Sequence, residues 1–249
     1  MRVLALDTTT REGSVALVVD DRVVEERRGD SLRTHAERLP AEILAVIDQH
    51  GLTTADVDLF AVASGPGSFT GLRIGIATIQ GLAFTTGRPV VAVSALEVLA
   101  QIASATCPPG ALAAAWMDAH RREVFAALYR VTASPLYDSD RLSLMQGPTV
   151  DDPADILDRW AKYLDGASVT FIGDGVLLYA ETIHRLQAST EHAWSAPLLA
   201  GAVGRMAVAR ARRGETITPA AIQPLYVRRP DAELARDSSP LGRTRGTQG

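Results

Sequence analysis

The run from Gly65 to Gly75, Gly-Pro-Gly-Ser-Phe-Thr-Gly-Leu-Arg-Ile-Gly, constrains the fold of this chain more than any other stretch. It joins an apolar run over residues 59–64, typical of a buried strand, to a helical run over residues 74–86. Glycines on both sides of Pro66 allow positive φ angles or a close backbone approach, and the proline fixes one φ between them. The sequence therefore predicts a strand, a tight loop and a helix.

Two familiar kinds of glycine-rich loop do not fit this run. A phosphate-binding P-loop needs Gly-Lys followed by Ser or Thr, whereas Gly71 is followed by Leu72 and Arg73. A dinucleotide fingerprint would place its third glycine at position 70, which is Thr70. The loop therefore favours neither cofactor.

One face of the following helix carries small side chains. Gly71 and Gly75 lie one turn apart, and Thr78 and Leu82 continue the same face. Because this backbone is nearly bare, another helix could pack against it very closely, and we interpret the face as a partner surface. Packing inside the same domain is the alternative interpretation.

A second helix is predicted earlier in the chain. Thr34 and Glu37 fit a capping box, and the helix should run to about residue 50. Leu39, Ile43 and Ile47 form its apolar stripe. Other polar positions of this helix, Arg38 and Glu42 among them, mark the side expected to face water.

Composition limits the kind of protein. The chain has 249 residues, of which 47% are hydrophobic, enough for a sizeable core in two domains. A net charge of -4 argues against a free-standing nucleic-acid binder, although it leaves a local basic patch open. One cysteine, a start unlike a signal peptide and no apolar run of roughly 18 residues favour a cytoplasmic protein without a membrane span.

The first strand is predicted to end at an acid. Residues 3–6 are apolar, and Asp7 follows them with Thr8 and Thr9 directly after it. In a phosphate site such an acid holds magnesium or a water while the loop faces phosphate oxygens. A turn capped by these side chains is an equally good interpretation of the same residues.

The second half repeats this outline. Residues 111–117 predict a strand ending at Asp118, and a later strand runs into Gly173-Asp174-Gly175. The two halves each read as a β-meander followed by alternating α and β elements, which suggests an internal duplication. We therefore expect domains over residues 1–106 and 107–229 and, because few apolar residues follow, a disordered tail over residues 230–249.

Five segments in order carry a family resemblance. They are Asp7-Thr8-Thr9, the Gly65 to Gly75 run, residues 117–124, Gly173-Asp174-Gly175 and Leu225-Tyr226-Val227-Arg228. With them the chain resembles the bacterial tRNA threonylcarbamoyladenosine biosynthesis proteins of the TsaB family. The resemblance implies the two-lobed α/β fold of actin and sugar kinases (ASKHA), with Asp7 and Asp118 at the phosphate-loop positions and Gly173 to Gly175 near the adenosine position.

The resemblance also separates this chain from a catalytic sister family, TsaD. In TsaD the helix after the fifth strand begins with a His-Leu-Glu-Gly-His pattern whose two histidines bind metal. The matching residues here are Ala95 to Leu99, and neither alanine nor leucine can ligate a metal. We therefore expect no catalytic residues and no metal site.

The resemblance implies a non-catalytic subunit that activates TsaD for threonylcarbamoyl transfer to the tRNA adenosine beside the anticodon. Its implied partners are TsaD, the ATPase TsaE, a second copy of itself when alone, and tRNA through the complex. TsaD is expected to form a helix bundle with the two predicted helices, and the partner-binding residues would be Leu39, Ile43, Ile47, Gly71, Gly75, Thr78 and Leu82. We expect no required cofactor and at most weak binding of ATP or ADP with magnesium. Two rivals stay open: an independent ATP-dependent phosphotransferase or ATPase of the actin and sugar-kinase class, and a metallopeptidase.

Overall fold

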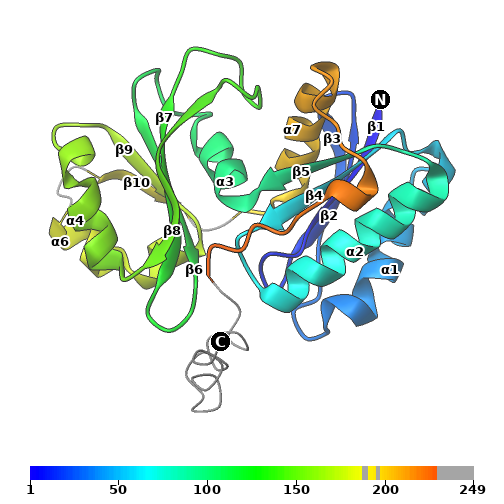
Figure 1. The fold of residues 1–249 in the computed structure, drawn as a ribbon, viewed down its shortest axis with the longest axis horizontal. Coiled ribbons are helices and arrows are strands. Elements are labelled where there is room, and N and C mark those ends of the chain that lie inside the picture. The colour runs from blue at the N-terminus through cyan, green and yellow to red at the C-terminus, as the bar shows by residue number, and fades with distance from the viewer. Residues whose placement is uncertain (187–189, 195–196, 229–249) are drawn as a thin grey trace, which may run out of the picture.

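A computed structural model describes residues 1–186, 190–194 and 197–228. The predicted disorder of residues 230–249 lies outside this range. The chain forms two lobes, each built on a five-stranded sheet (Figure 1). The strands of the first sheet are β1 (Arg2–Asp7), β2 (Ser14–Val19), β3 (Arg22–Arg28), β4 (Leu59–Gly65) and β5 (Val90–Ser94). Those of the second are β6 (Leu112–Asp118), β7 (Val124–Val131), β8 (Leu142–Asp151), β9 (Val169–Ile172) and β10 (Thr190–Trp194).

The two sheets share one topology. The first has the order β3-β2-β1-β4-β5, and the second, read in the same direction, has β8-β7-β6-β9-β10. In each, the first strand pairs antiparallel with the second and parallel with the fourth. This repetition confirms the predicted α/β fold of two β-meander and αβ halves, and it supports the inferred duplication.

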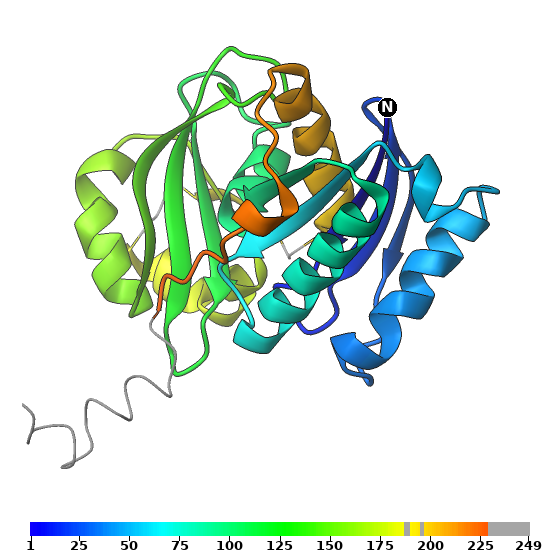
Figure 2. The same ribbon diagram turned by 45° about the vertical axis from the view of Figure 1, so that its right-hand side comes forward.

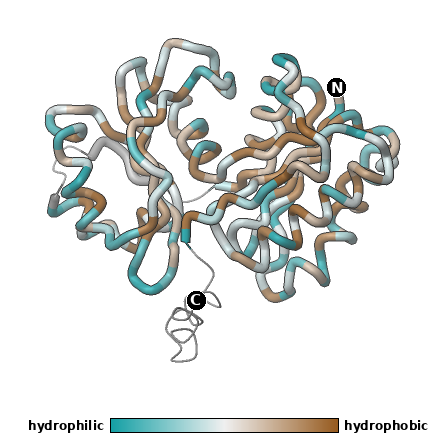
Figure 3. The backbone as a smooth tube through the Cα atoms, in the orientation of Figure 1, coloured by the Kyte–Doolittle hydropathy of each residue, from teal (hydrophilic) through white to brown (hydrophobic). Residues whose placement is uncertain are grey.

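Helices cover both faces of each sheet. The outer face of the first sheet carries α1 (His35–Asp48) and α2 (Phe69–Thr86), and the second sheet carries α4 (Pro153–Leu164) and α6 (Ala180–Leu186) on its outer side (Figure 1). Between the sheets lie α3 (Ala95–Ala103) and α7 (Ala200–Arg212). The short α5 (Asp174–Leu178) follows β9. The hydrophobic residues concentrate along the strands, and the outer loops are more hydrophilic (Figure 3).

Alternation along the strands explains these layers. In β1, Leu4 and Leu6 face the core beneath α1 and α2, whereas Val3 and Ala5 face the central layer that holds α3 and α7. Because both faces are buried, the strand reads as a continuous apolar run in the sequence.

Residue 106 separates the strands of the two sheets, but two helices pack across that division. α3 precedes residue 106 yet contacts β6, β7 and β9 of the second sheet more than β4 and β5. α7 follows residue 106 yet packs on β1, β2, β3, β4 and β5 of the first sheet. The two helices cross between the lobes because each supplies the apolar cover that the opposite sheet lacks.

The segment after α7 returns along the first lobe and then reaches the second (Figure 2). Ile217 pairs with Val90, and the N–H of Leu225 donates to the carbonyl oxygen of Ser64 at 2.7 Å. Arg228 then donates to the carbonyl oxygen of Ala119 at 2.8 Å. Within the described residues, no helix is both long enough and apolar enough to cross a membrane.

Candidate functional site

A cleft of about 350 Å³ lies between the lobes, at the carboxyl ends of the central strands. Its polar lining includes Asp7, Glu12, Arg28 and Asp174. Its apolar lining is Leu99, Met117, Leu177, Pro197, Leu198 and Leu199. Ligands of open α/β sheets bind at this end of the strands, so the cleft is the candidate site.

Asp7 ends β1, as the sequence predicted, and is only 3% exposed. One carboxylate oxygen, Oδ1, accepts hydrogen bonds from the Thr9 N–H at 2.9 Å and the Thr9 hydroxyl at 2.7 Å. Burial raises the pKa of Asp7, and the charge of Asp174 adds to the rise. Asp7 therefore caps its own turn and also presents a costly negative charge to the cleft.

Asp118 and Asp174 are brought together in the second lobe. The Asp174 Oδ1 atom accepts the N–H of Asp118 and the N–H of Gly175, both at 2.9 Å. Burial raises the pKa of Asp174, and the nearby Asp118 charge contributes. Asp118 itself accepts the His120 N–H at 2.8 Å and lies 3.0 Å from the His120 Nδ1 atom.

Gly173 and Gly175 serve close packing against β6. Gly173 has φ +127°, and a Cβ there would lie 1.9 Å from the carbonyl oxygen of Trp116. A Cβ on Gly175 would lie 3.2 Å from the carbonyl carbon of Met117. Only a residue without a side chain allows α5 to start so near the neighbouring strand.

The turn after β1 explains Gly71 and Gly75 of α2, and also Gly67, which precedes the helix. A Cβ on Gly71 would lie 2.2 Å from the Thr8 carbonyl oxygen, and one on Gly75 would lie 2.2 Å from the Thr8 Oγ1 atom. A Cβ on Gly67 would likewise lie 2.4 Å from the Thr9 carbonyl oxygen. The bare helix face is therefore filled by the Thr8 and Thr9 turn.

Five of the seven predicted partner residues are consequently inside the folded monomer. Leu39, Ile43 and Ile47 are at most 3% exposed and pack beneath the first sheet, and Gly71 and Gly75 are buried. The interpretation of these five as an exposed partner surface is wrong, because the stripe faces this chain's own sheet. Thr78 and Leu82 are half-buried.

The solvent-facing side of the two outer helices has other residues. On α2 it exposes Ala77, Gly81 and Phe84, and the Phe84 side chain is 82% exposed. On α1 it exposes Leu44, at 51%. A Cβ added to Gly81 would meet nothing within 4 Å. We call these four residues the outer strip.

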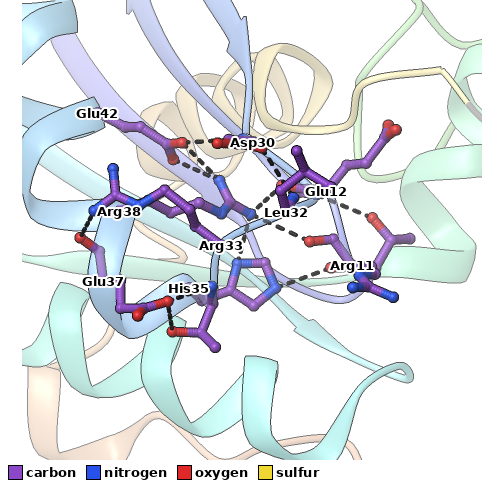
Figure 4. Close-up of polar contacts among 12 residues, drawn as sticks. Arg11, Glu12, Asp30, Leu32, Arg33, His35, Glu37, Arg38 and Glu42 are labelled. Atoms are coloured by element: carbon purple, nitrogen blue, oxygen red, sulfur yellow. Dashed lines mark hydrogen bonds and ion pairs between the residues drawn. The ribbon is translucent and has the colours of Figure 1, made fainter.

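A buried polar network, missed in the sequence, ties α1 to the cleft loop (Figure 4). Arg38 is 2% exposed and donates to both Glu42 oxygens at 2.6 and 2.8 Å. It also donates to the carbonyl oxygens of Arg11 and Glu12. The expectation that Arg38 faces water is wrong, since Arg38 shares the buried face with the apolar stripe, and its partner Glu42 is only 18% exposed.

His35 completes this network. An arginine only donates, so Arg38 donates to the His35 Nδ1 atom at 2.8 Å, and the His35 Nε2–H donates to the Thr10 carbonyl oxygen at 3.0 Å. Burial, followed by the Arg38 charge, lowers the pKa of His35 and keeps the ring neutral. Three successive carbonyls of the cleft loop are thereby fixed to α1. The spacing of polar residues at positions 35, 38 and 42 along the apolar stripe is the sequence signal for it.

Some N–H groups of the two strand-end loops are used within the loops themselves. In the first, the Thr9 N–H is donated to Asp7 and the Gly13 N–H to the Thr10 hydroxyl at 3.2 Å. In the second, the Ala119 N–H is donated to the Glu123 carbonyl oxygen. Phosphate is bound through free N–H groups, so these three N–H groups are not available for it. Among the described residues, no group of three His, Cys, Asp or Glu side chains could hold a metal ion.

Comparison with known proteins agrees with the two-lobed α/β fold described above. The fold is similar to component A of (R)-2-hydroxyglutaryl-CoA dehydratase from Acidaminococcus fermentans, with a TM-score of 0.50, 12% identity and coverage of 85% of this chain and 99% of that one. The chain therefore has the two-lobed α/β fold that the resemblance to the actin and sugar-kinase (ASKHA) class implied.

Within that class, residues 29–237 match the family described as TsaD: tRNA N6-adenosine threonylcarbamoyltransferase. The structure of YeaZ from Pseudomonas aeruginosa is 32% identical, with a TM-score of 0.71 and coverage of 90% of this chain and 99% of that one. The tRNA threonylcarbamoyladenosine biosynthesis protein TsaB of Escherichia coli is 33% identical over 60% of this chain. The alignment spans 64% of that relative's length. The chain belongs to the TsaD family, in its TsaB (YeaZ) group.

Proposed function

We propose that this chain is a non-catalytic subunit of the machinery that makes N6-threonylcarbamoyladenosine on tRNA, and that it binds and activates a TsaD enzyme. The names of its relatives, threonylcarbamoyladenosine biosynthesis protein and threonylcarbamoyltransferase, support the pathway. In this proposal it works in the cytoplasm, where tRNA is modified, with TsaE as a further member of the assembly.

The residues at the start of α3 support the proposal that this chain is not catalytic. Ala95 and Leu99 occupy the positions at which the resemblance places the metal-binding histidines of TsaD, and both are at most 1% exposed. Leu99 lines the interlobe cleft. A methyl group and an isobutyl group have no lone pair to give a metal, so this helix offers the cleft no ligand.

The outer strip supports the proposal that this chain binds TsaD. On α2, a phenylalanine that is 82% exposed shares one helix face with two residues that have almost no side chain, which lets a partner helix approach closely, and α1 adds a half-exposed leucine. We propose that TsaD covers this strip, formed by Leu44, Ala77, Gly81 and Phe84. A second copy of the chain covers it when TsaD is absent.

Reconstitution tests the proposal. The chain, TsaD and both together are incubated with threonylcarbamoyl-adenylate and tRNA, and the modified nucleoside is measured by mass spectrometry. We expect none from the chain alone and more from the pair than from TsaD alone. Modified nucleoside from the chain alone would contradict the non-catalytic role, and an unchanged TsaD rate would contradict activation.

Gly81→Leu tests the strip directly. Because an added side chain at Gly81 meets open space and leucine is the better helix former, the monomer should melt no lower than the wild type. A leucine there separates the two helix backbones, at a cost of about 1 to 3 kcal/mol, or roughly ten- to a hundredfold in affinity for TsaD. Ala133→Leu, which adds a similar bulk at an exposed position of the second lobe, is the control. Equal affinity of both variants would place the interface elsewhere.

The rival kinase or ATPase function predicts turnover of ATP by the isolated chain. We expect no turnover, because three of the strand-end N–H groups that could face phosphates are donated within their own loops. Binding of ATP or ADP with magnesium stays a prediction, and it should be weak. Calorimetry with each nucleotide measures it, and tight binding with turnover would favour the rival.

A further inference from the structure

An exposed stack of planar side chains lies where α2 begins. The Arg73 guanidinium lies over the Phe69 ring, 3.9 Å from its centroid, and its Nε donates to the Tyr226 hydroxyl at 3.2 Å. The rings of Phe69 and Tyr226 are 5.3 Å apart and tilted by 32°. Arg73 is exposed, and Tyr226 is 40% exposed. These contacts fix the planar groups at the surface before any ligand binds.

The same chain segment leads to a basic loop of the second lobe. Arg228, two residues after Tyr226, donates to the carbonyl oxygen of Ala119, where the β6–β7 loop begins. Three exposed residues of this loop have left-handed φ angles: His120 at 57°, Arg121 at 55° and Arg122 at 65°. Consecutive left-handed residues other than glycine are uncommon and gather at functional sites.

Charge distinguishes this region from the rest of the molecule. The chain as a whole carries -4. The region holds four arginines, against the acids Asp118 and Glu123. These arginines are Arg73, Arg121, Arg122 and Arg228. Phe69 follows β4 and the basic loop follows β6, so the region lies at the carboxyl ends of both central strands.

We propose that the rim cluster, formed by Phe69, Arg73, Arg122 and Tyr226, binds the unpaired loop of an RNA hairpin. Aromatic rings and arginine planes are the platforms on which unstacked bases lie, and arginines also contact the phosphates. A continuous duplex presents no free base face to such a platform. The inference rests on the proposed function, because it takes tRNA as the substrate of the assembly and makes this chain one of its contacts.

Two kinds of variant separate stacking from charge. The RNA is a hairpin with the anticodon loop that contains the target adenosine, and its affinity is measured at several salt concentrations for the full chain alone and with TsaD. Tyr226→Ala should weaken binding about tenfold and leave the salt dependence unchanged, since stacking releases no counterions. Arg122→Gln should weaken binding several-fold and reduce the slope of log K against log salt by about 0.7.

Controls keep the test specific. Tyr226→Phe retains the ring and should restore most of the affinity, and Arg22→Gln, at an exposed position of β3, should change nothing. A blunt duplex of the same length should bind the wild type and Tyr226→Ala equally. Because these positions are exposed, melting temperatures should match that of the wild type.

The outcomes distinguish this inference from the proposed function. If the chain binds and activates TsaD while both variants bind the hairpin like the wild type, the RNA contact is wrong and the subunit role stands. If the variants bind TsaD more weakly with RNA affinity unchanged, the cluster contacts protein and the inference is overturned. If TsaD is neither bound nor activated yet the hairpin is bound through Tyr226, the subunit role fails and the RNA site stands.

Discussion

Asp7 is a residue whose burial should make stability depend on pH. Burial raises its pKa above the ordinary 3.8, so the folded chain holds this proton more tightly than the unfolded chain does. That contribution is fully present below pH 3.8 and is lost as the pH rises through the folded pKa. Asp7→Asn keeps an oxygen for Thr9 and removes the charge. It should therefore raise the free energy of unfolding at neutral pH, by an amount that shrinks toward acid pH.

Urea unfolding of both proteins at about pH 4, 5.5 and 7.5 measures the difference. Asp20 is the control, because its hydrogen bond to the N-terminal amino group lowers its pKa and reverses the sign. Relative to the wild type, the free energy of unfolding of Asp20→Asn should fall as the pH rises. A destabilised Asp7→Asn at neutral pH would show that the Asp7 carboxylate has a stabilising partner.

Gly75 and Gly81 lie in one helix and should respond oppositely to alanine. A Cβ on Gly75 overlaps the Thr8 Oγ1 atom at 2.2 Å, which should cost about 1 to 3 kcal/mol, whereas Gly81 has open space and should gain up to about 1 kcal/mol from helix propensity. Thr8→Ala removes the overlapping atom, so the double variant with Gly75→Ala should recover part of the loss. Thermal unfolding of the four proteins gives the coupling, and strict additivity would contradict the contact.

Among single residues, the sequence predicted where an acid ends a strand better than it predicted what surrounds a given side chain. Asp7 and Asp118 end their strands as expected. The direction in which Gly75 faces was not predictable, because periodicity defines a helix face but not which neighbour covers it. Thr8 lies far away in sequence, and no local pattern links the two residues.

At the scale of elements, a local capping pattern predicts the capping hydrogen bonds of a helix only where no residue distant in sequence binds the same side chain. The capping box of Thr34 and Glu37 forms, with the Glu37 carboxylate accepting the Thr34 N–H at 2.8 Å, and α1 starts there. Ser94 and Glu97 have the same spacing at the start of α3, but no side-chain capping hydrogen bond forms there. Glu97 instead accepts two hydrogen bonds from Arg210 of α7, at 2.7 and 2.8 Å. A charged residue more than a hundred positions away decides that outcome.

The pair of Arg38 and Glu42 gives the prediction that belongs to this scale. Glu42→Gln leaves the buried guanidinium without its counter-charge, and breaking such a pair costs about 3 to 5 kcal/mol. Arg38→Met with Glu42→Leu removes both charges and should recover much of this loss. The double variant still lacks the bonds to the Arg11 and Glu12 carbonyls, so the cleft loop should exchange its amide hydrogens faster than in the wild type.

Hydrogen exchange and urea unfolding of the three proteins measure both effects. Asp48→Asn, at an exposed position of the same helix, is the control for the loss of a carboxylate. If the double variant exchanges its loop amides like the wild type, α1 does not hold the cleft loop. If Glu42→Gln is neutral, the guanidinium finds enough compensation in the loop carbonyls.

At the scale of the whole molecule, the two sheets share one hydrophobic layer. The central hydrophobic layer contains strands of both sheets together with α3 and α7. Arg213 of the α7 end also pairs with Asp138 and Asp140 of the second lobe. The duplication was visible in the sequence, but the exchange of helices was not, because an apolar helix face fits either sheet.

Residues 1–106 should therefore fail to fold alone, although they contain a complete sheet. Without α7, the face of β1 and β2 that carries Val3, Ala5, Ala16 and Val18 loses its cover. The lost contacts include four almost fully buried side chains: Leu199, Val203, Met206 and Val208. At about 1.5 to 3 kcal/mol each, these four account for roughly 6 to 12 kcal/mol, which matches the whole stability of a typical domain of about 5 to 15 kcal/mol.

Joining residues 197–228 to residues 1–106 through a flexible linker should restore a cooperative unfolding transition, because it returns α7 and the segment that pairs with Val90. Residues 153–186 joined in the same way form the control, since α4 and α6 pack on the second sheet. Circular dichroism during heating and dispersion of amide signals in NMR measure folding. Cooperative unfolding of residues 1–106 alone would show that the first sheet does not need α7. Equal behaviour of both fusions would show that any added helix suffices.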